Sequence, residues 1–161
     1  MIELYDATLR DGMGGGGMSL TADEKVRLVR RLDELGVDLI EAGFPASNPK
    51  EAELFGLLAG ETLSHAEIAA FGMTRRRGIA AADDAGLQVL AACFAPVCTL
   101  VGKASTLHVE KVVRVSREEN LAMIADSVAF LAEHGKRVLF DAEHFFDGYV
   151  DDAAFALDCL R

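Results

Sequence analysis

An arginine–aspartate pair stands near the start of the chain, in the stretch 8-TLRDGMGGGGMSL-20. An aspartate at the end of a strand can hold a hard divalent cation through its carboxylate oxygens. An adjacent guanidinium can bind the carboxylate or keto oxygen of a small acid and stabilise a developing enolate. Arg10 and Asp11 are therefore candidates for a site that binds a metal ion and an anionic substrate.

The glycines of the same stretch allow another interpretation, because Gly12, Gly14 and Gly17 fit the pattern G-x-G-x-x-G of a dinucleotide-binding loop. Glu41 then ends the next expected strand, near the place of a ribose-binding acid. In that motif the last glycine opens a helix, whereas here the helix begins only after Thr21. Asp11 would also face a pyrophosphate of the same charge. We therefore favour the site built on the charged pair.

Further polar side chains follow the other expected strands, at the edge of the sheet where ligands of parallel α/β folds bind. They are Glu41 after the second strand, Thr74 and Arg75 after the third, Thr99 and Lys103 at the fourth, and Asp141, Glu143 and His144 after the fifth. Strand ends are often polar because they lie near the surface. Their recurrence on five successive strands favours a functional site.

Short apolar runs alternate with amphipathic ones along the chain, which predicts repeated strand–helix units. After residues 2–5, we expect strands over 37–43, 67–73, 97–102 and 137–143, and helices over 21–36, 49–60, 78–92, 116–135 and 151–161. Two helices open on capping boxes, Thr21 with Glu24 and Ser116 with Glu119. Strand–helix alternation indicates a parallel sheet, and the apolar strands indicate that both faces are covered. Periodicity leaves open a doubly wound sheet or the first part of an eight-stranded barrel.

Composition narrows the classes of partner. The 161 residues carry a net charge of −10 and are 51% hydrophobic, which fits one globular domain over residues 1–161 with no second domain. The negative charge argues against nucleic acid or an anionic membrane as a partner. No apolar run is long enough to span a bilayer, and no signal peptide is recognisable. The three cysteines show no C-x-x-C spacing, so we expect free thiols in a cytoplasmic protein.

Several motifs together resemble the DRE-TIM metallolyase superfamily, and most closely its citramalate, isopropylmalate and homocitrate synthases. They are DATLRDG, IEAGFPASNPKEAELF, FGMTRRRG, LVGKASTLHVEKVV and FDAEHFFDGY, in this order over essentially the whole chain. Within that family the similarity to citramalate synthases is greatest. The resemblance implies a (β/α)8 barrel, of which this chain is the N-terminal portion with about five βα units.

The same resemblance implies a reaction in which acetyl-CoA condenses with a 2-oxo acid such as pyruvate and CoA is released by hydrolysis. This acyl transfer depends on a divalent metal (Mg2+, Mn2+ or Zn2+) and belongs to branched-chain amino-acid biosynthesis, that of isoleucine above leucine. Asp11 would be a metal ligand, and Arg10, Glu41 and Glu143 would be catalytic, with Glu143 helping to form the enolate. Arg10, Arg75, Thr99 and Lys103 are the expected substrate-binding residues.

The chain departs from the family pattern at three points. Gly14 and Gly16 stand where the family has Gln and Glu, and 102-GKASTLH-108 lacks the usual tryptophan. The family's H-x-H metal pair, on the seventh strand, has no counterpart here.

From these departures we expect a fragment or a half-barrel that is inactive as a monomer and associates through its open edges, for example as a homo-oligomer. The rival hypotheses are an isopropylmalate or homocitrate synthase, a related lyase, and a non-catalytic half-barrel that serves as an assembly module.

Overall fold

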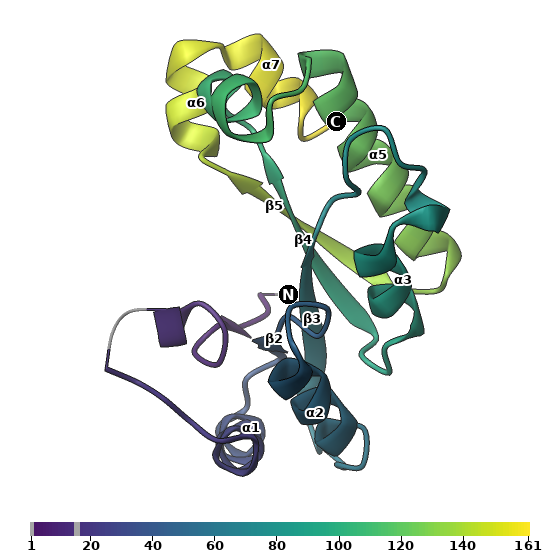
Figure 1. The fold of residues 1–161 in the computed structure, drawn as a ribbon. Coiled ribbons are helices and arrows are strands. Elements are labelled where there is room, and N and C mark those ends of the chain that lie inside the picture. The colour runs from purple at the N-terminus through teal and green to yellow at the C-terminus, as the bar shows by residue number, and fades with distance from the viewer. Residues whose placement is uncertain (1, 15–16) are drawn as a thin grey trace.

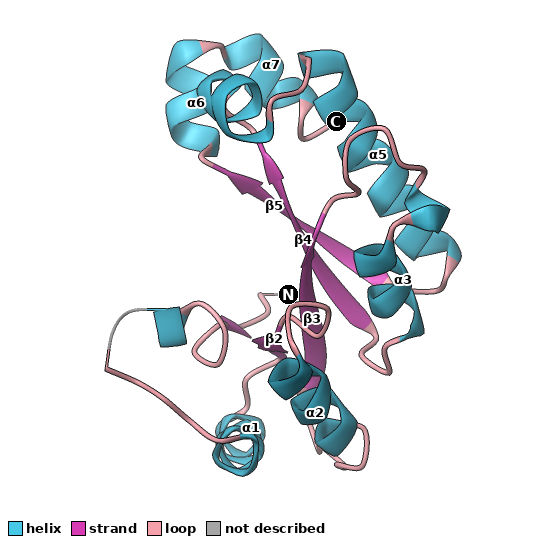
Figure 2. Ribbon diagram, in the orientation of Figure 1, coloured by secondary structure: helices cyan, strands magenta, loops and turns pink. Residues whose placement is uncertain are grey.

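The computed structural model describes residues 2–14 and 17–161, and its centre is one sheet of five parallel strands (Figures 1 and 2). The strands are β1 (Tyr5–Asp6), β2 (Leu39–Gly43), β3 (Glu67–Met73), β4 (Val97–Lys103) and β5 (Arg137–Glu143). Their order in space is β1-β2-β3-β4-β5. A doubly wound sheet reverses its order at a switch point, whereas a barrel adds strands in sequence. The observed order is therefore that of a half-barrel.

The longer helices cover one face of this sheet. They are α1 (Ala22–Leu35), α2 (Pro49–Leu58), α3 (Ala85–Ala92) and α5 (Arg117–Glu133). The main hydrophobic core joins Val29 of α1, Leu54 of α2 and Leu87 of α3 to alternate strand residues such as Ile40 and Cys98. Because side chains alternate along a strand, the residues between these point to the opposite face, called the inner face below.

The inner face is only partly covered, which differs from the expectation of two covered faces. A small layer of Leu39, Ala69 and Val97 is buried there, and Leu139 of β5 packs against it while remaining half-buried. The strands are apolar because the helices cover one face and this layer fills the base of the other. β5 carries the two exposed residues Arg137 and Asp141, as an end strand of the sheet can.

Both predicted capping-box helix starts are observed, but only one of them forms both hydrogen bonds of the box. The Thr21 side chain accepts from the Glu24 N–H, and the Glu24 carboxylate accepts from the Thr21 N–H, so this capping box is confirmed. The Ser116 side chain likewise accepts from the Glu119 N–H at the start of α5. The Glu119 carboxylate turns instead to Arg75 and to the Gly78 N–H, because these donors compete for it.

One predicted helix is split, and another follows a helix that was not predicted. In the stretch 78–92, a short turn at Ala81–Asp83 precedes α3, because the Asp84 side chain accepts from the N–H groups of Gly86 and Leu87. The predicted final helix, 151–161, is the shorter α7 (Ala153–Asp158), and the unpredicted α6 (Phe145–Asp151) lies directly before it. Asp152 separates them, with φ −149° and ψ 88°, and its side chain caps α7 at the Phe155 N–H.

The remaining helical segments lie after β4 and in the first loop. They are η1 (Gly12–Gly14), α4 (Thr106–His108) and the π-helical turn η3 (Val109–Val113). Figure 1 shows α6 and α7 beyond the ends of β4 and β5, at the opposite end of the molecule from α1 and α2. Within the described residues, none of the helices is long and apolar enough to cross a membrane.

Candidate active site

Arg10 is held over the inner face by two contacts. Its Nε donates to the Glu41 Oε1 oxygen in a short ion pair, and its guanidinium carbon lies 3.9 Å from the centre of the Phe71 ring. The Glu41 side chain is only 1% exposed, whereas that of Arg10 is 26% exposed. A buried carboxylate and an aromatic face thus fix the guanidinium while leaving part of it open to solvent.

Tyr5 and Thr99 complete the surroundings of the Glu41 carboxylate. The Tyr5 hydroxyl donates to Glu41 Oε2 in a short hydrogen bond and lies 2.7 Å from the Thr99 hydroxyl oxygen. Burial, and then the hydrogen bond to Glu41, raise the pKa of the Tyr5 phenol well above its usual value. Each Glu41 oxygen therefore accepts a hydrogen bond within the protein. The contribution of Glu41 to the site is to hold Arg10 in place.

Lys103 and Glu143 form a second charged pair at the ends of β4 and β5. The two residues are directly opposite one another in the sheet, and Lys103 Nζ donates to Glu143 Oε2 in a short ion pair. Lys103 lies four residues beyond Thr99 on the same strand, and so on the same inner face. At about 3.3 Å per residue, the pair is about 13 Å along β4 from Thr99. The predicted residues thus fall into two groups, Arg10 with Glu41 and Thr99, and Lys103 with Glu143.

Arg75 belongs to neither group. Its side chain is 7% exposed, and its guanidinium donates to Glu119 and Asp126, both on α5. Its backbone N–H donates to the Ser127 hydroxyl. These bonds hold the cation on the helix side of the sheet and join the end of β3 to α5. Arg75 also lines the rim cavity described below, so its role in substrate binding stays a prediction.

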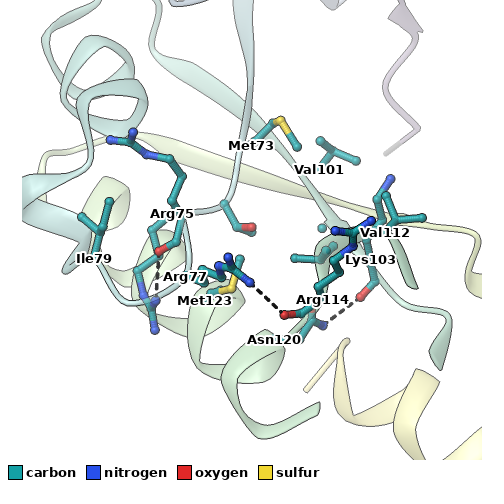
Figure 3. Close-up of a pocket in the computed structure, with 14 residues that line it drawn as sticks. Met73, Arg75, Arg77, Ile79, Val101, Lys103, Val112, Arg114, Asn120 and Met123 are labelled. Atoms are coloured by element: carbon teal, nitrogen blue, oxygen red, sulfur yellow. Dashed lines mark hydrogen bonds between the residues drawn. The ribbon is translucent and has the colours of Figure 1, made fainter. Parts of the chain in front are cut away.

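A cavity of about 620 Å³ opens at the rim between the ends of β3 and β4, the turn η3 and α5 (Figure 3). Apolar side chains such as Met73, Val101 and Met123 line it, together with Lys103 and the exposed Arg77 and Arg114. Arg77 donates to the Arg114 carbonyl, which joins the loop after β3 to η3. The cavity therefore offers positive charge beside an apolar wall, next to the Lys103–Glu143 pair.

A stacked histidine pair adjoins Glu143. The rings of His108 and His144 lie 3.7 Å apart at 7°. His144 Nε2 is 3.8 Å from Glu143 Oε1, and His144 has φ 61°, a conformation uncommon for residues other than glycine. Burial, and then the neighbouring His144 and Lys103, lower the pKa of His108. The pair therefore favours a neutral His108.

Asp11, the predicted metal ligand, is open to solvent. Its side chain is 77% exposed, and Oδ1 lies 3.4 Å from Nη1 of Arg10. Among the described residues, no three or more His, Cys, Asp or Glu side chains are grouped so as to hold a metal ion. The residues present therefore do not form a metal centre, and Asp11 alone could supply one carboxylate to a site completed by other donors.

Of the two glycines that replace the family's Gln and Glu in the first loop, the structure describes only Gly14. An added Cβ at Gly14 would meet no atom within 4 Å, so the backbone leaves room there for a side chain such as glutamine. Gly16 lies outside the described residues. Gly12–Gly14 forms a short 3-10 turn rather than the start of a long helix, which disfavours the dinucleotide-binding interpretation.

Comparison with known proteins decides the family. The model of the HMGL-like family matches residues 1–160. The chain belongs to the HMGL-like family. This HMGL-like chain is 44% identical over 160 residues to the (R)-citramalate synthase of Sulfolobus acidocaldarius and 42% identical over 161 residues to that of Geobacter sulfurreducens. These alignments cover 99% and 100% of the chain but 31% and 30% of the relatives, so it spans about a third of their length.

A solved structure supports the fold of the HMGL-like chain. The hydroxymethylglutaryl-CoA lyase of Pseudomonas aeruginosa superposes with a TM-score of 0.66 at 20% identity, over 86% of this chain and 45% of that one. The expected fold, the N-terminal part of a (β/α)8 barrel, is therefore confirmed.

Sequence reasoning missed three neighbours of the predicted residues: Tyr5, Phe71 and the stacked partner of His144. Tyr5 and Phe71 are apolar enough to be assigned to the core of a strand. An alternation signal did exist, because Glu41 and Thr99 each lie between two residues of the helix-covered core and Phe71 directly follows one, Ala70. The stacking of His108 on His144 had no such signal, since it depends on α4 and α6 meeting in space.

Proposed function

We propose that this HMGL-like chain forms the N-terminal part of the active-site barrel of a citramalate-synthase-type acyltransferase. The proposed reaction condenses acetyl-CoA with pyruvate to a 2-hydroxy diacid and CoA, a step of isoleucine biosynthesis. The curated relatives at 38–45% identity over nearly the whole chain, all named (R)-citramalate synthase, support this choice. An isopropylmalate synthase of Sulfolobus acidocaldarius is 33% identical over a similar range. The choice of pyruvate as the 2-oxo acid therefore rests on the higher identity to the citramalate synthases.

The observation that carries the proposal is the fixed and partly exposed Arg10. Its Nε is committed to Glu41, and among the described residues its Nη2 has no hydrogen-bond partner. A guanidinium anchored at Nε, with Nη2 open and Nη1 in only a long contact with the exposed Asp11, is suited to bind the carboxylate and keto oxygen of a 2-oxo acid. The charge is already in place when the keto oxygen becomes an alkoxide, so little reorganisation is needed.

The second charged group supplies the base in this proposal. Glu143 accepts a hydrogen bond from Lys103 at Oε2 and takes a proton from the acetyl methyl group. The resulting enolate carbon forms a bond to the keto carbon, whose oxygen takes the electron pair next to Arg10. Water then hydrolyses the thioester and CoA leaves. The rim cavity would hold the phosphates of CoA through Arg77 and Arg114.

A second candidate, a non-catalytic half-barrel that serves in assembly, is favoured by one observation. Within the described residues the donors for a complete metal centre are not grouped. The sheet also ends at β1 and β5, and open strand edges can pair with another chain. We therefore include this candidate as an outcome of the test.

The test joins residues 1–161 to the remainder of the Geobacter sulfurreducens relative, in place of the matched segment. Thiol release from acetyl-CoA is followed with Mg2+ or Mn2+ and one 2-oxo acid at a time, for the chain alone and for the chimera. We expect the chimera to prefer pyruvate over branched or dicarboxylic 2-oxo acids by at least about tenfold in kcat/KM. A preference for another acid would move the proposal to an isopropylmalate or homocitrate synthase. A folded but inactive chimera, with tight self-association of the chain, would favour the assembly module.

A further inference from the structure

Tyr5 connects the first strand to the charged group on the inner face. The chain runs from Thr99 through the Tyr5 hydroxyl to Glu41 and from there to Arg10. A phenol has one hydrogen to donate, and Tyr5 donates it to Glu41. The Thr99 hydroxyl must therefore be the donor in its 2.7 Å contact with the Tyr5 oxygen.

This order of donors fixes the carboxylate in one orientation. Glu41 is 1% exposed, with Oε1 bound to Arg10 and Oε2 bound to Tyr5. Without the Tyr5 hydroxyl, Oε2 would be a buried charged acceptor without its donor, and the side chain would rotate or admit water to regain one. Arg10 would follow, because the shorter of its two ion pairs is to the other oxygen of the same carboxylate, and its partner in the longer pair, Asp11, is exposed.

We propose that Tyr5 is a positioning residue of the active site, whose hydroxyl holds Glu41 so that Arg10 presents its terminal nitrogens to the substrate. The ring of Tyr5 is not needed for this role, since the hydroxyl makes both bonds. The inference rests on the proposed function for what Arg10 binds, whereas the hydrogen-bonded chain itself stands on the geometry alone.

The chain offers a matched control for the hydroxyl. It contains two tyrosines and no tryptophan. Tyr149 of α6 is 47% exposed. Tyr5→Phe and Tyr149→Phe therefore remove the same oxygen at a bonded site and at an open one. In the Tyr149→Phe protein, Tyr5 is the only phenol, so its ionisation can be followed by ultraviolet absorbance.

Two measurements on the full chain test the arrangement without any ligand. Hydrogen exchange of the Arg10 Nε–H, followed by NMR, should be about tenfold faster in Tyr5→Phe and unchanged in Tyr149→Phe. In the Tyr149→Phe protein, Tyr5 should ionise above the usual value near 10, and Glu41→Gln should lower that midpoint. An unchanged exchange rate together with an ordinary Tyr5 titration would overturn the proposal. If Tyr5→Phe does not fold, the titration of Tyr5 decides.

A double-mutant cycle with pyruvate as the probe tests the effect on substrate. Tyr5→Phe should weaken pyruvate binding about tenfold, and Tyr149→Phe should leave it unchanged. Tyr5→Phe added to Arg10→Ala should weaken binding no further, because the effect passes through Arg10. Equal losses in both backgrounds would show that Tyr5 acts on packing alone and would overturn the proposal. The cycle is measured in the chimera. If the chimera with unmodified residues 1–161 binds no pyruvate, the proposed function fails at this step, and the ligand-free measurements still decide the role of Tyr5.

Discussion

Arg10 gains its chemical character from neighbours that are far apart in the sequence. Glu41 lies 31 residues away and binds Nε, while Phe71 of the next strand supplies the surface on which the guanidinium rests. An isolated surface arginine would pay side-chain entropy each time it binds an anion. Here that entropy is lost on folding, so the residue is prepared for a ligand before the ligand arrives.

The sequence predicts the residues at the rim better than it predicts their partners. Arg10, Glu41, Thr99, Lys103 and Glu143 could be chosen because strand ends converge at one edge of a parallel sheet. Which of them pair depends on alternation along each strand and on side-chain rotamers, neither of which is set by local spacing. For the same reason the sequence did not reveal that two carboxylates of α5 bind Arg75.

The stacked histidines predict a pH dependence of stability. The pKa of His108 is lowered in the folded protein, so the unfolded chain binds this proton more readily. The neutral form is present above the ordinary value of 6.5, and the free energy of unfolding should fall as the pH drops below it. His108→Phe keeps a stacked ring that does not titrate. Its melting temperature should therefore fall less than that of the unmodified protein between about pH 7.5 and about pH 5.

Burial is the main cause of the lowered pKa of His108. The neighbouring His144 and Lys103 also disfavour its protonation, whereas Asp147 favours it. Equal losses of melting temperature in the two proteins would show that other groups carry the acid sensitivity.

At the scale of elements, the ends of a strand were predictable where an apolar run stops at residues that favour turns. The bounds of β3 and β5 match the predicted ranges 67–73 and 137–143, since polar or glycine-containing turns flank an apolar run. The split of the predicted helix 78–92 at Asp84 was missed, and so was α6, which ends just before the cap Asp152. An aspartate inside an alanine-rich segment is tolerated in a helix, and only the local backbone decides whether it becomes a cap.

The placement of α6 depends on a close approach to β4. A Cβ added to Gly148 would lie 2.2 Å from the Ala104 carbonyl oxygen, too close for any side chain. Gly148→Ala should therefore lower the free energy of unfolding by about 1–3 kcal/mol through overpacking. Chemical denaturation followed by circular dichroism measures this change.

Gly56 of α2 provides the control for the same substitution. An added Cβ at this position meets no atom within 4 Å. Gly56→Ala should raise the free energy of unfolding by about 0.5–1 kcal/mol, because alanine favours a helix over glycine. If both variants were stabilised alike, the contact between α6 and the backbone after β4 would not be as tight as described.

At the scale of the whole molecule, the half-barrel brings residues of five strands to one rim. Sequential strand order and helices on a single face produce this result, since both direct the carboxyl ends of the strands to the same side. Lys103 of the second charged group lies about 13 Å along β4 from Thr99 of the first, with the basic cavity beside Lys103. In the proposed reaction, a 2-oxo acid at Arg10 meets a larger thioester that enters from the cavity.

The most direct test of this account is the effect of Arg10→Ala on pyruvate-dependent thiol release by the chimera. The matched control is Arg31→Ala, since Arg31 lies on α1 with a side chain that is 77% exposed. We predict that Arg10→Ala lowers kcat/KM by about 100-fold or more, as loss of an oxyanion-stabilising group does, and that Arg31→Ala changes it less than about twofold. An active chimera that tolerates Arg10→Ala as well as Arg31→Ala would contradict the account.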